Sequence, residues 1–262
     1  MIRVNFVLRR RPGMSAQDFE NIFRNVYGPL VAKYQSILEL QKYIQSYTLL
    51  KDTLGAALRA ARPEMHEPFD GTAAFWWPNR ERMVAALGSP AGKAALAELI
   101  ECERTFADLS RSCIFLTREI PQINPMPEDC ILARNGSPIV KLIYVLHALP
   151  ALGRAGCQVW WQTRHGAITR RYGAAMGFLR YIQSHSFDDP LHAALANDRG
   201  TLEAYDGMTE VWFDRLYLDS VIRNPDCDGS EGFGLLLEDE YKFVDLSGAS
   251  TWFAKEQVLI ER

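Results

Sequence analysis

The chain has 262 residues, of which 48% are hydrophobic and 23% are charged, a composition typical of one large globular domain or two small ones. Its net charge of −3 excludes the strongly basic surface of a nucleic-acid-binding protein. The five cysteines are odd in number and include no Cys-x-x-Cys pair. They therefore favour free thiols in the reducing cytoplasm over a disulfide framework or a zinc site: Cys102, Cys113, Cys130, Cys157 and Cys227.

The first element in chain order is a strand, because residues 2–8 read IRVNFVL and are rich in β-branched side chains. The charges that follow stand in the wrong place for a signal peptide, and no apolar run approaches the roughly 20 residues that span a bilayer. We therefore expect neither secretion nor a membrane segment. A helix comes next, with Ser15 as its N-cap and Asp18 three residues on. Its apolar side chains recur at helical spacing: Phe19, Ile22, Phe23, Val26 and Leu30.

The rest of the first half predicts three more strands, through residues 43–46, 70–77 and 112–120. A short helix is expected within residues 52–61. One or two helices follow the third strand, with the alanine-rich residues 81–98 as the clear case. Residues 121–138 contain four prolines and predict a connector. The second half predicts the same order, with a helix that carries Trp160 and Trp161 and with strands at residues 139–146, 181–184, 206–213 and 250–258.

The two halves are copies of one unit. Tyr43-Ile44-Gln45-Ser46 recurs 138 residues on as Tyr181-Ile182-Gln183-Ser184, and Trp76 recurs 136 residues on as Trp212. Landmarks that keep their order with a drift of one or two residues indicate a tandem duplication. We predict a first unit over residues 1–120, a linker over 121–138 and a second unit over 139–262.

Each unit has the order βαββαβ, which is the split βαβ arrangement of a ferredoxin-like fold. The sheet of such a unit is covered by helices on one face and needs a partner for the other. We therefore predict an α+β protein in which two tandem ferredoxin-like units pack sheet to sheet as an intramolecular barrel.

The second half contains a recognisable pattern: Trp160-Trp161-x-x-x-His165, Tyr181-x-Gln183, Asp206-Gly207-x-x-Glu210-x-Trp212-Phe213 and Asp239-Glu240-x-x-Phe243-x-Asp245. This pattern resembles the EthD domain, a family of the dimeric α/β-barrel superfamily. The resemblance covers nearly the whole chain as two copies and implies an intramolecular dimeric α/β barrel. Family members include decarboxylases and oxygenases of aromatic polyketides. Most members of the superfamily use no organic cofactor, so the resemblance implies none here.

The first copy departs from the second at four polar positions. Tyr27 replaces His165, Tyr47 replaces His185, Ala74 replaces Glu210 and Cys102 replaces Asp239. We therefore interpret the second copy as the active one and the first as a degenerate scaffold, although Tyr27 and Tyr47 could themselves act as donors.

His165 is the predicted general acid–base, with Glu210 to orient or charge it. Tyr181, Gln183 and His185 alternate along one strand and so share a face, and Tyr172 follows His165 by seven residues on its helix. The predicted substrate-binding residues are Tyr172, Tyr181, Gln183, His185, Trp161 and Trp212. Purely structural roles are the alternatives: a histidine at a helix end, an outward glutamate, a glutamine that bonds alike in both copies, and core tryptophans.

Other chemistries find little support, since the chain has no glycine-rich phosphate loop, no Gly-x-Ser-x-Gly and no His-Glu-x-x-His. We predict no metal site and no cofactor. Haem binding through a helix histidine, known in the wider superfamily, is left open. Our leading hypothesis is a cofactor-independent lyase of the decarboxylase type that acts on a small aromatic or polyketide-like molecule. The alternatives are a cofactor-free monooxygenase of the anthrone-oxidising kind and a non-catalytic ligand-binding or accessory protein.

The expected partner is accordingly a small hydrophobic or aromatic substrate, with neither nucleic acid nor membrane involved. A homodimer is left open.

Overall fold

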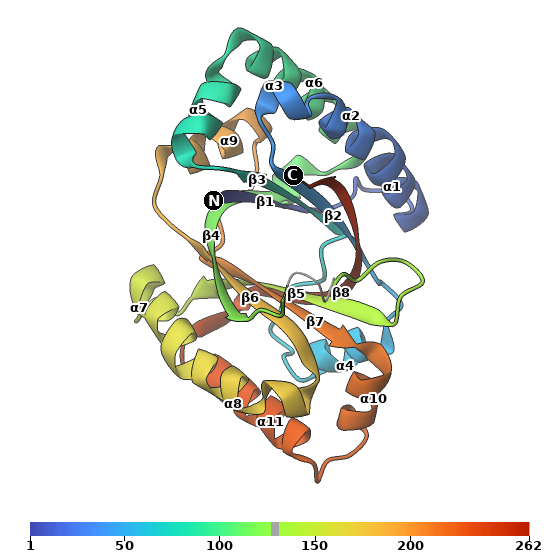
Figure 1. Ribbon diagram of the computed structural model, residues 1–262, viewed down its shortest axis with the longest axis vertical. Coiled ribbons are helices and arrows are strands. Elements are labelled where there is room, and N and C mark those ends of the chain that lie inside the picture. The colour runs from blue at the N-terminus through green and yellow to red at the C-terminus, as the bar shows by residue number, and fades with distance from the viewer. Residues whose placement is uncertain (127–130, 262) are drawn as a thin grey trace.

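The computed structural model describes residues 1–126 and 131–261 of the chain. Within these residues, antiparallel strands close into a barrel in the order β1-β3-β2-β8-β5-β7-β6-β4 (Figure 1). The strands are β1 (Ile2–Leu8), β2 (Lys42–Thr48), β3 (Gly71–Trp77), β4 (Cys113–Ile123), β5 (Ile139–Ala148), β6 (Phe178–Ser186), β7 (Gly207–Asp214) and β8 (Val244–Glu261). The fold class is therefore α+β, as predicted. Four cysteine thiols are free, and Cys130 lies outside the described residues.

The sheets of the two halves are hydrogen-bonded to each other at both edges. The strand order within the first half is β4-β1-β3-β2, and within the second it is β8-β5-β7-β6. Strand β2 then pairs with β8, and β4 pairs with β6. Strand β4 reaches this partner by running into the segment predicted as a linker, where Pro121 lies opposite Ile182. Closure removes the unpaired edges that an open sheet would expose.

The helices lie outside the barrel in two groups (Figure 1). They are α1 (Ala16–Ile22), α2 (Gly28–Lys33), α3 (Gln35–Leu38), α4 (Thr53–Ala60), α5 (Arg80–Gly88), α6 (Pro90–Phe106), α7 (Gly153–Trp160), α8 (Gly166–Met176), α9 (Pro190–Arg199), α10 (Arg215–Ile222) and α11 (Asp228–Glu240). Ser15 caps α1, as predicted, by accepting a hydrogen bond from the Asp18 amide.

Of the one or two helices predicted around residues 81–98, the structure has two, α5 and α6, which meet at 83°. Pro90 removes one helical amide, and the Ser89 hydroxyl caps the new helix through the Gly92 amide at 2.9 Å. No single helix in the described part of the chain is long and apolar enough to cross a membrane. Only α5 and α6 taken together reach that length and apolar content, and the chain bends sharply between them.

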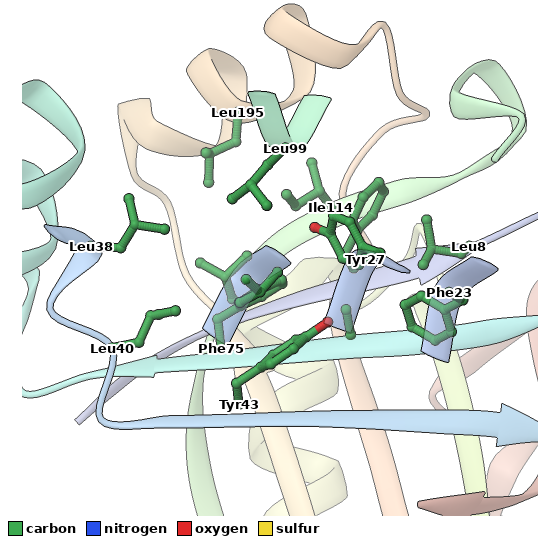
Figure 2. Packing of buried hydrophobic residues seen from close by; sticks show 14 of the residues in the cluster. Leu8, Phe23, Tyr27, Leu38, Leu40, Tyr43, Phe75, Leu99, Ile114 and Leu195 are labelled. Carbon is green, nitrogen blue, oxygen red and sulfur yellow. The ribbon is translucent and has the colours of Figure 1, made fainter. Parts of the chain in front are cut away.

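Two helices cross over to the opposite half. Helix α4 belongs to the first half by sequence, but its Leu54 and Leu58 pack in the core of the second half. Helix α9 belongs to the second half, and its Leu195 packs in the core of the first. Figure 1 shows α9 among the helices of the first half and α4 among those of the second. Figure 2 shows Leu195 beside Leu99 of α6. The sheet of each half is therefore covered in part by one helix that the other half contributes.

Strand alternation divides the buried side chains into an outer layer under the helices and an inner layer within the barrel. The outer layer of the first half is the apolar cluster of Figure 2, which includes Tyr27, Tyr43 and Phe75. The inner layer draws on both halves. It is apolar at one end, around Phe115 and Trp252. Elsewhere it mixes apolar side chains such as Trp76 and Trp212 with ion pairs, in which Arg3 of β1 reaches Glu210 of β7 across the barrel.

Candidate active site

His165 lies where α7 passes into α8 through a π-helical turn, η4 (Trp161–His165). The first copy has the same turn, η1 (Phe23–Tyr27), which ends on Tyr27. A π-turn adds one residue to a helical turn and re-aims the side chains at its end, which is why such turns often occur at functional sites. The shared turn brings His165 and Tyr27 to matching places under the helices of their halves.

Asp239 of α11 is the partner of His165. The His165 Nδ1 atom lies 3.1 Å from the Asp239 Oδ2 atom, and the Trp160 indole also donates to this carboxylate. Burial alone would raise the pKa of Asp239, but the hydrogen bonds from His165 and Trp160 lower it below its ordinary value. The carboxylate is therefore ionised and can only accept, so His165 Nδ1 carries the proton and donates it. This tautomer leaves the Nε2 lone pair of His165 available as a base.

Tyr181, Gln183 and His185 of β6 share a face, as the alternation predicted, and this face meets the helices. Gln183 donates from its Nε2 atom to the Trp161 carbonyl at 3.1 Å and to the Tyr181 hydroxyl at 3.0 Å, and its Oε1 atom accepts from His185 Nε2 at 3.1 Å. The Trp161 indole donates to the Tyr181 hydroxyl at 3.0 Å and stacks on His185, with ring centroids 4.7 Å apart. Burial lowers the pKa of His185 to about 4, so this ring is neutral at pH 7.

The first copy contains the same row. Gln45 donates to the Phe23 carbonyl at 2.7 Å and to the Tyr43 hydroxyl at 2.8 Å, and it accepts from Tyr47 at 2.6 Å. Because the network is complete in both halves, it favours a structural role for the glutamine and for His185. In the second copy, Tyr181 lines the cavity beside His165, whereas Gln183 and His185 do not line it.

The predicted pairing of Glu210 with His165 is wrong. Thr209 faces the cavity that contains His165, so the next residue along β7, Glu210, points to the opposite face of the sheet. There Glu210 pairs with Arg3 and, at 2.5 Å, with Lys141 Nζ. Burial alone would raise the pKa of Glu210, but these two cations hold it well below its usual range. Glu210 therefore belongs to the ionic interior of the barrel.

Two predicted substrate-binding residues also lie away from His165. Trp212 lies two residues after Glu210 on β7 and therefore shares its face, towards the barrel interior. There its indole donates to Glu256 at 2.7 Å. Tyr172 lies on the outer side of α8 and donates to Glu231 of α11 at 3.0 Å. Neither side chain lines the cavity that contains His165.

The sequence interpretation missed an ion pair that forms part of the cavity wall. Arg62, which follows α4 of the first half, binds Glu240 of α11 through two hydrogen bonds of 2.6 and 2.7 Å. The Tyr144 hydroxyl donates to the same carboxylate at 3.3 Å. The first half has the matching pair, since Arg199 of α9 binds Glu103 at 2.7 and 3.0 Å. Arg199 follows Arg62 by 137 residues and Glu240 follows Glu103 by 137, and this common spacing was the sequence signal for the exchange.

The cavity of the second half has a volume of about 70 Å³ and lies between the outer face of the sheet and the helices. Its polar lining consists of His165, Tyr144, Tyr181, Thr169, Thr209, Thr251 and the Arg62–Glu240 pair. The other lining residues are Leu58, Leu142, Leu146, Trp161, Phe178, Val211, Phe213, Phe233, Leu236, Phe243 and Val244. A few polar groups in a mostly apolar, aromatic cavity are typical of a site for a small organic ligand.

Within residues 1–126 and 131–261, no three His, Cys, Asp or Glu side chains gather in a way that could hold a metal ion.

A closed antiparallel barrel with helices outside and a cavity beneath them defines a dimeric α/β-barrel protein, here contained in one chain. The EthD domain matches residues 11–110 and again residues 149–247, so the chain belongs to the EthD-domain family and carries two domains in tandem. No curated protein matches the chain in sequence.

Several solved structures share the fold. An anthrone oxidase-like protein is 8% identical, with a TM-score of 0.56 over 98% of this chain and 92% of that one. A candidate monooxygenase from Lactobacillus acidophilus NCFM is 8% identical, with a TM-score of 0.46 over 98% and 94%. A candidate chlorite dismutase is 12% identical, with a TM-score of 0.49 over 98% and 94%. At such identities the likeness shows the fold alone.

Proposed function

We propose that the chain is a cofactor-independent enzyme that acts on a small aromatic or polyketide-like molecule through His165. The observation that carries this proposal is the His165–Asp239 pair, whose histidine lines a mostly apolar cavity. The carboxylate fixes the tautomer and stabilises the imidazolium that forms when Nε2 takes a proton. Both effects suit proton transfer to and from carbon in a site that excludes water.

The reaction we favour is of the lyase type. In a decarboxylation, the imidazolium of His165 donates a proton to the ring carbon that loses carbon dioxide. The alternative is a cofactor-free oxygenation, in which neutral His165 removes a proton from the carbon that then reacts with oxygen. The fold shared with an anthrone oxidase-like protein makes this the second candidate.

The two reactions are separated by what they consume and release. We would supply 2,4-dihydroxybenzoic acid and anthrone as probes and measure carbon dioxide release and oxygen uptake. His165→Gln should abolish the reaction, whereas the matched Tyr27→Phe of the first copy should leave it unchanged. Oxygen uptake without carbon dioxide release would select the second candidate. Binding of the probes with neither reaction would select a ligand-binding protein and reject the enzyme.

We further propose that each half is a ferredoxin-like unit and that the second is the active copy. The strand orders β4-β1-β3-β2 and β8-β5-β7-β6 support the first statement. Two differences at matching positions support the second: Tyr27 hydrogen-bonds Glu103 at 2.8 Å where His165 bonds Asp239, and Cys102 stands in place of that aspartate.

A further inference from the structure

A second, larger cavity adjoins the one that contains His165. Its volume is about 290 Å³, and five side chains line both cavities: Leu58, Arg62, Leu142, Phe213 and Phe233. Beyond these shared walls it is lined by Leu54, Ala57, Ala61, Leu218, Ile222, Ser230, Gly234, Leu237 and Phe253. Arg62 is the one charged residue in this lining, and Glu240 neutralises it. The second cavity is therefore an apolar groove, open at its outer side where Ala57, Ala61 and Gly234 are exposed.

The roof of the groove is α4, the helix that crosses from the first half. Its N-terminal cap, Asp52, pairs with Arg215 of α10, and Arg62 beyond its C-terminal end pairs with Glu240 of α11. Both anchors are residues of the second half. The roof is thus fixed to the half that contains His165, and the groove is a preformed part of that site.

The outer part of the groove differs from its counterpart in the first half. Residues 137 positions earlier line a surface hollow there, where Lys93 stands in place of Ser230 and Ala97 in place of Gly234, and Asp198 of α9 stands in place of Ala61. The inner walls are apolar in both halves, since Val4, Trp77, Leu96 and Leu195 line a cavity of about 40 Å³ in the first. The uncharged residues at the outer positions on the His165 side are therefore the feature that points to a ligand.

We propose that this groove binds the apolar chain of the ligand whose polar head lies at His165. The ligand class is an amphipathic molecule, an aromatic head that carries an alkyl or aryl tail. The inference rests on the proposed function for the position of the head. It also gives the first copy a role in the site: its helix α4 forms the wall that would contact the apolar tail.

The test is a series of 4-alkylphenols, from phenol to 4-hexylphenol, whose binding is followed by titration calorimetry. Each added methylene should tighten binding about fourfold while it enters the groove. Gly234→Leu fills the groove, and nothing lies within 4 Å of an added Cβ there, so the helix should keep its place. Ala61→Asp introduces the charge that the first half carries at this position. Both variants should bind phenol as the natural chain does and lose the dependence on chain length.

Asp198→Ala and Ala97→Leu are the matched controls in the first half, and they should keep the full dependence on chain length. Binding that is independent of chain length in the natural chain would overturn the proposal, as would an unchanged dependence in both groove variants. Because the readout is binding, His165→Gln should keep the dependence on chain length even as it abolishes turnover. The proposed function and the groove therefore fail separately.

Discussion

At the scale of single residues, the proposed chemistry depends on the carboxylate that holds His165. Asp239→Asn keeps the shape of the side chain but removes the charge that fixes the imidazole tautomer and stabilises the imidazolium. We expect kcat to fall by about 10²-fold, within the usual contribution of general acid–base catalysis, with little change in KM. Steady-state kinetics on whichever probe the enzyme turns over would measure both kcat and KM. Asp239→Glu should restore part of kcat, and a loss confined to KM would mean that Asp239 only shapes the cavity.

His185 gives the fold a pH dependence of its own. Its pKa is about 4 in the folded chain because it is buried, whereas an unfolded histidine titrates near 6.5. The unfolded chain therefore binds the extra proton first, and stability is complete above about pH 6.5 and falls as the pH drops towards 4. The loss attributable to His185 is on the order of 3 kcal/mol.

Urea unfolding of the natural chain and of His185→Gln, compared between pH 4 and 7, would isolate this contribution from that of the carboxylates. The free energies of unfolding of the two proteins should converge at low pH, because the variant has no such proton to bind. Two parallel curves would mean that His185 is not the titrating group.

At the scale of helices and strands, the exchanged helices should be tied down by their arginines. Arg62→Met leaves Glu240 buried without its partner, and Arg199→Met does the same to Glu103. Breaking a buried ion pair on one side costs about 3–5 kcal/mol, so both variants should be destabilised to a similar extent in chemical unfolding. Only Arg62→Met should also weaken binding of 4-hexylphenol, because Arg62 alone touches the groove. Equal effects of both variants on binding would contradict the assignment of the roof to α4.

The strand periodicity explains what the sequence could and could not reveal. Alternation placed Tyr181, Gln183 and His185 on one face, and the structure agrees that this face meets the helices. It could not say which face of β7 holds Glu210, because both faces of a barrel strand are buried and residues 207–213 show no contrast in burial. Duplication identified the polar differences between the copies, including Asp239, but it carried no information on which glutamate or aspartate meets His165.

The crossing of α4 was equally hidden. A short helix within residues 52–61 followed from composition, but its partner sheet depends on the path of a loop that local propensity does not determine. The arginines offered a clue, since Arg62 follows α4 and Arg199 ends α9, each with leucines four and eight residues earlier. Such a repeat shows that the helices are equivalent. The ion pairs with Glu240 and Glu103 and the packing of the leucines show that each helix packs on the other half.

At the scale of the whole molecule, the barrel interior holds the two halves together through charge. Arg3 of the first half pairs with Glu210, and Lys141 bridges Glu210 and, at 3.1 Å, Glu256. Glu210→Gln should destabilise the fold by about 3 kcal/mol, because it leaves two buried cations short of one negative charge. It should leave kcat unchanged, since Glu210 lies across the sheet from His165. A loss of activity at full stability would instead return Glu210 to the reaction.

Barrel closure also predicts that the halves depend on one another. Residues 1–126 alone would expose the edges of β2 and β4 and the apolar patch around Phe115, and Arg3 would lose Glu210. Unpaired edges and an uncovered apolar face promote association, so we expect this fragment to form dimers or aggregates on size-exclusion chromatography. Mixing it with residues 131–262 should give a 1:1 complex of the mass of the intact chain, because β2·β8 and β4·β6 pairing then closes the barrel. A monomeric, cooperatively folded fragment would show that each sheet is stable alone and that duplication serves only to bring α4 over the cavity.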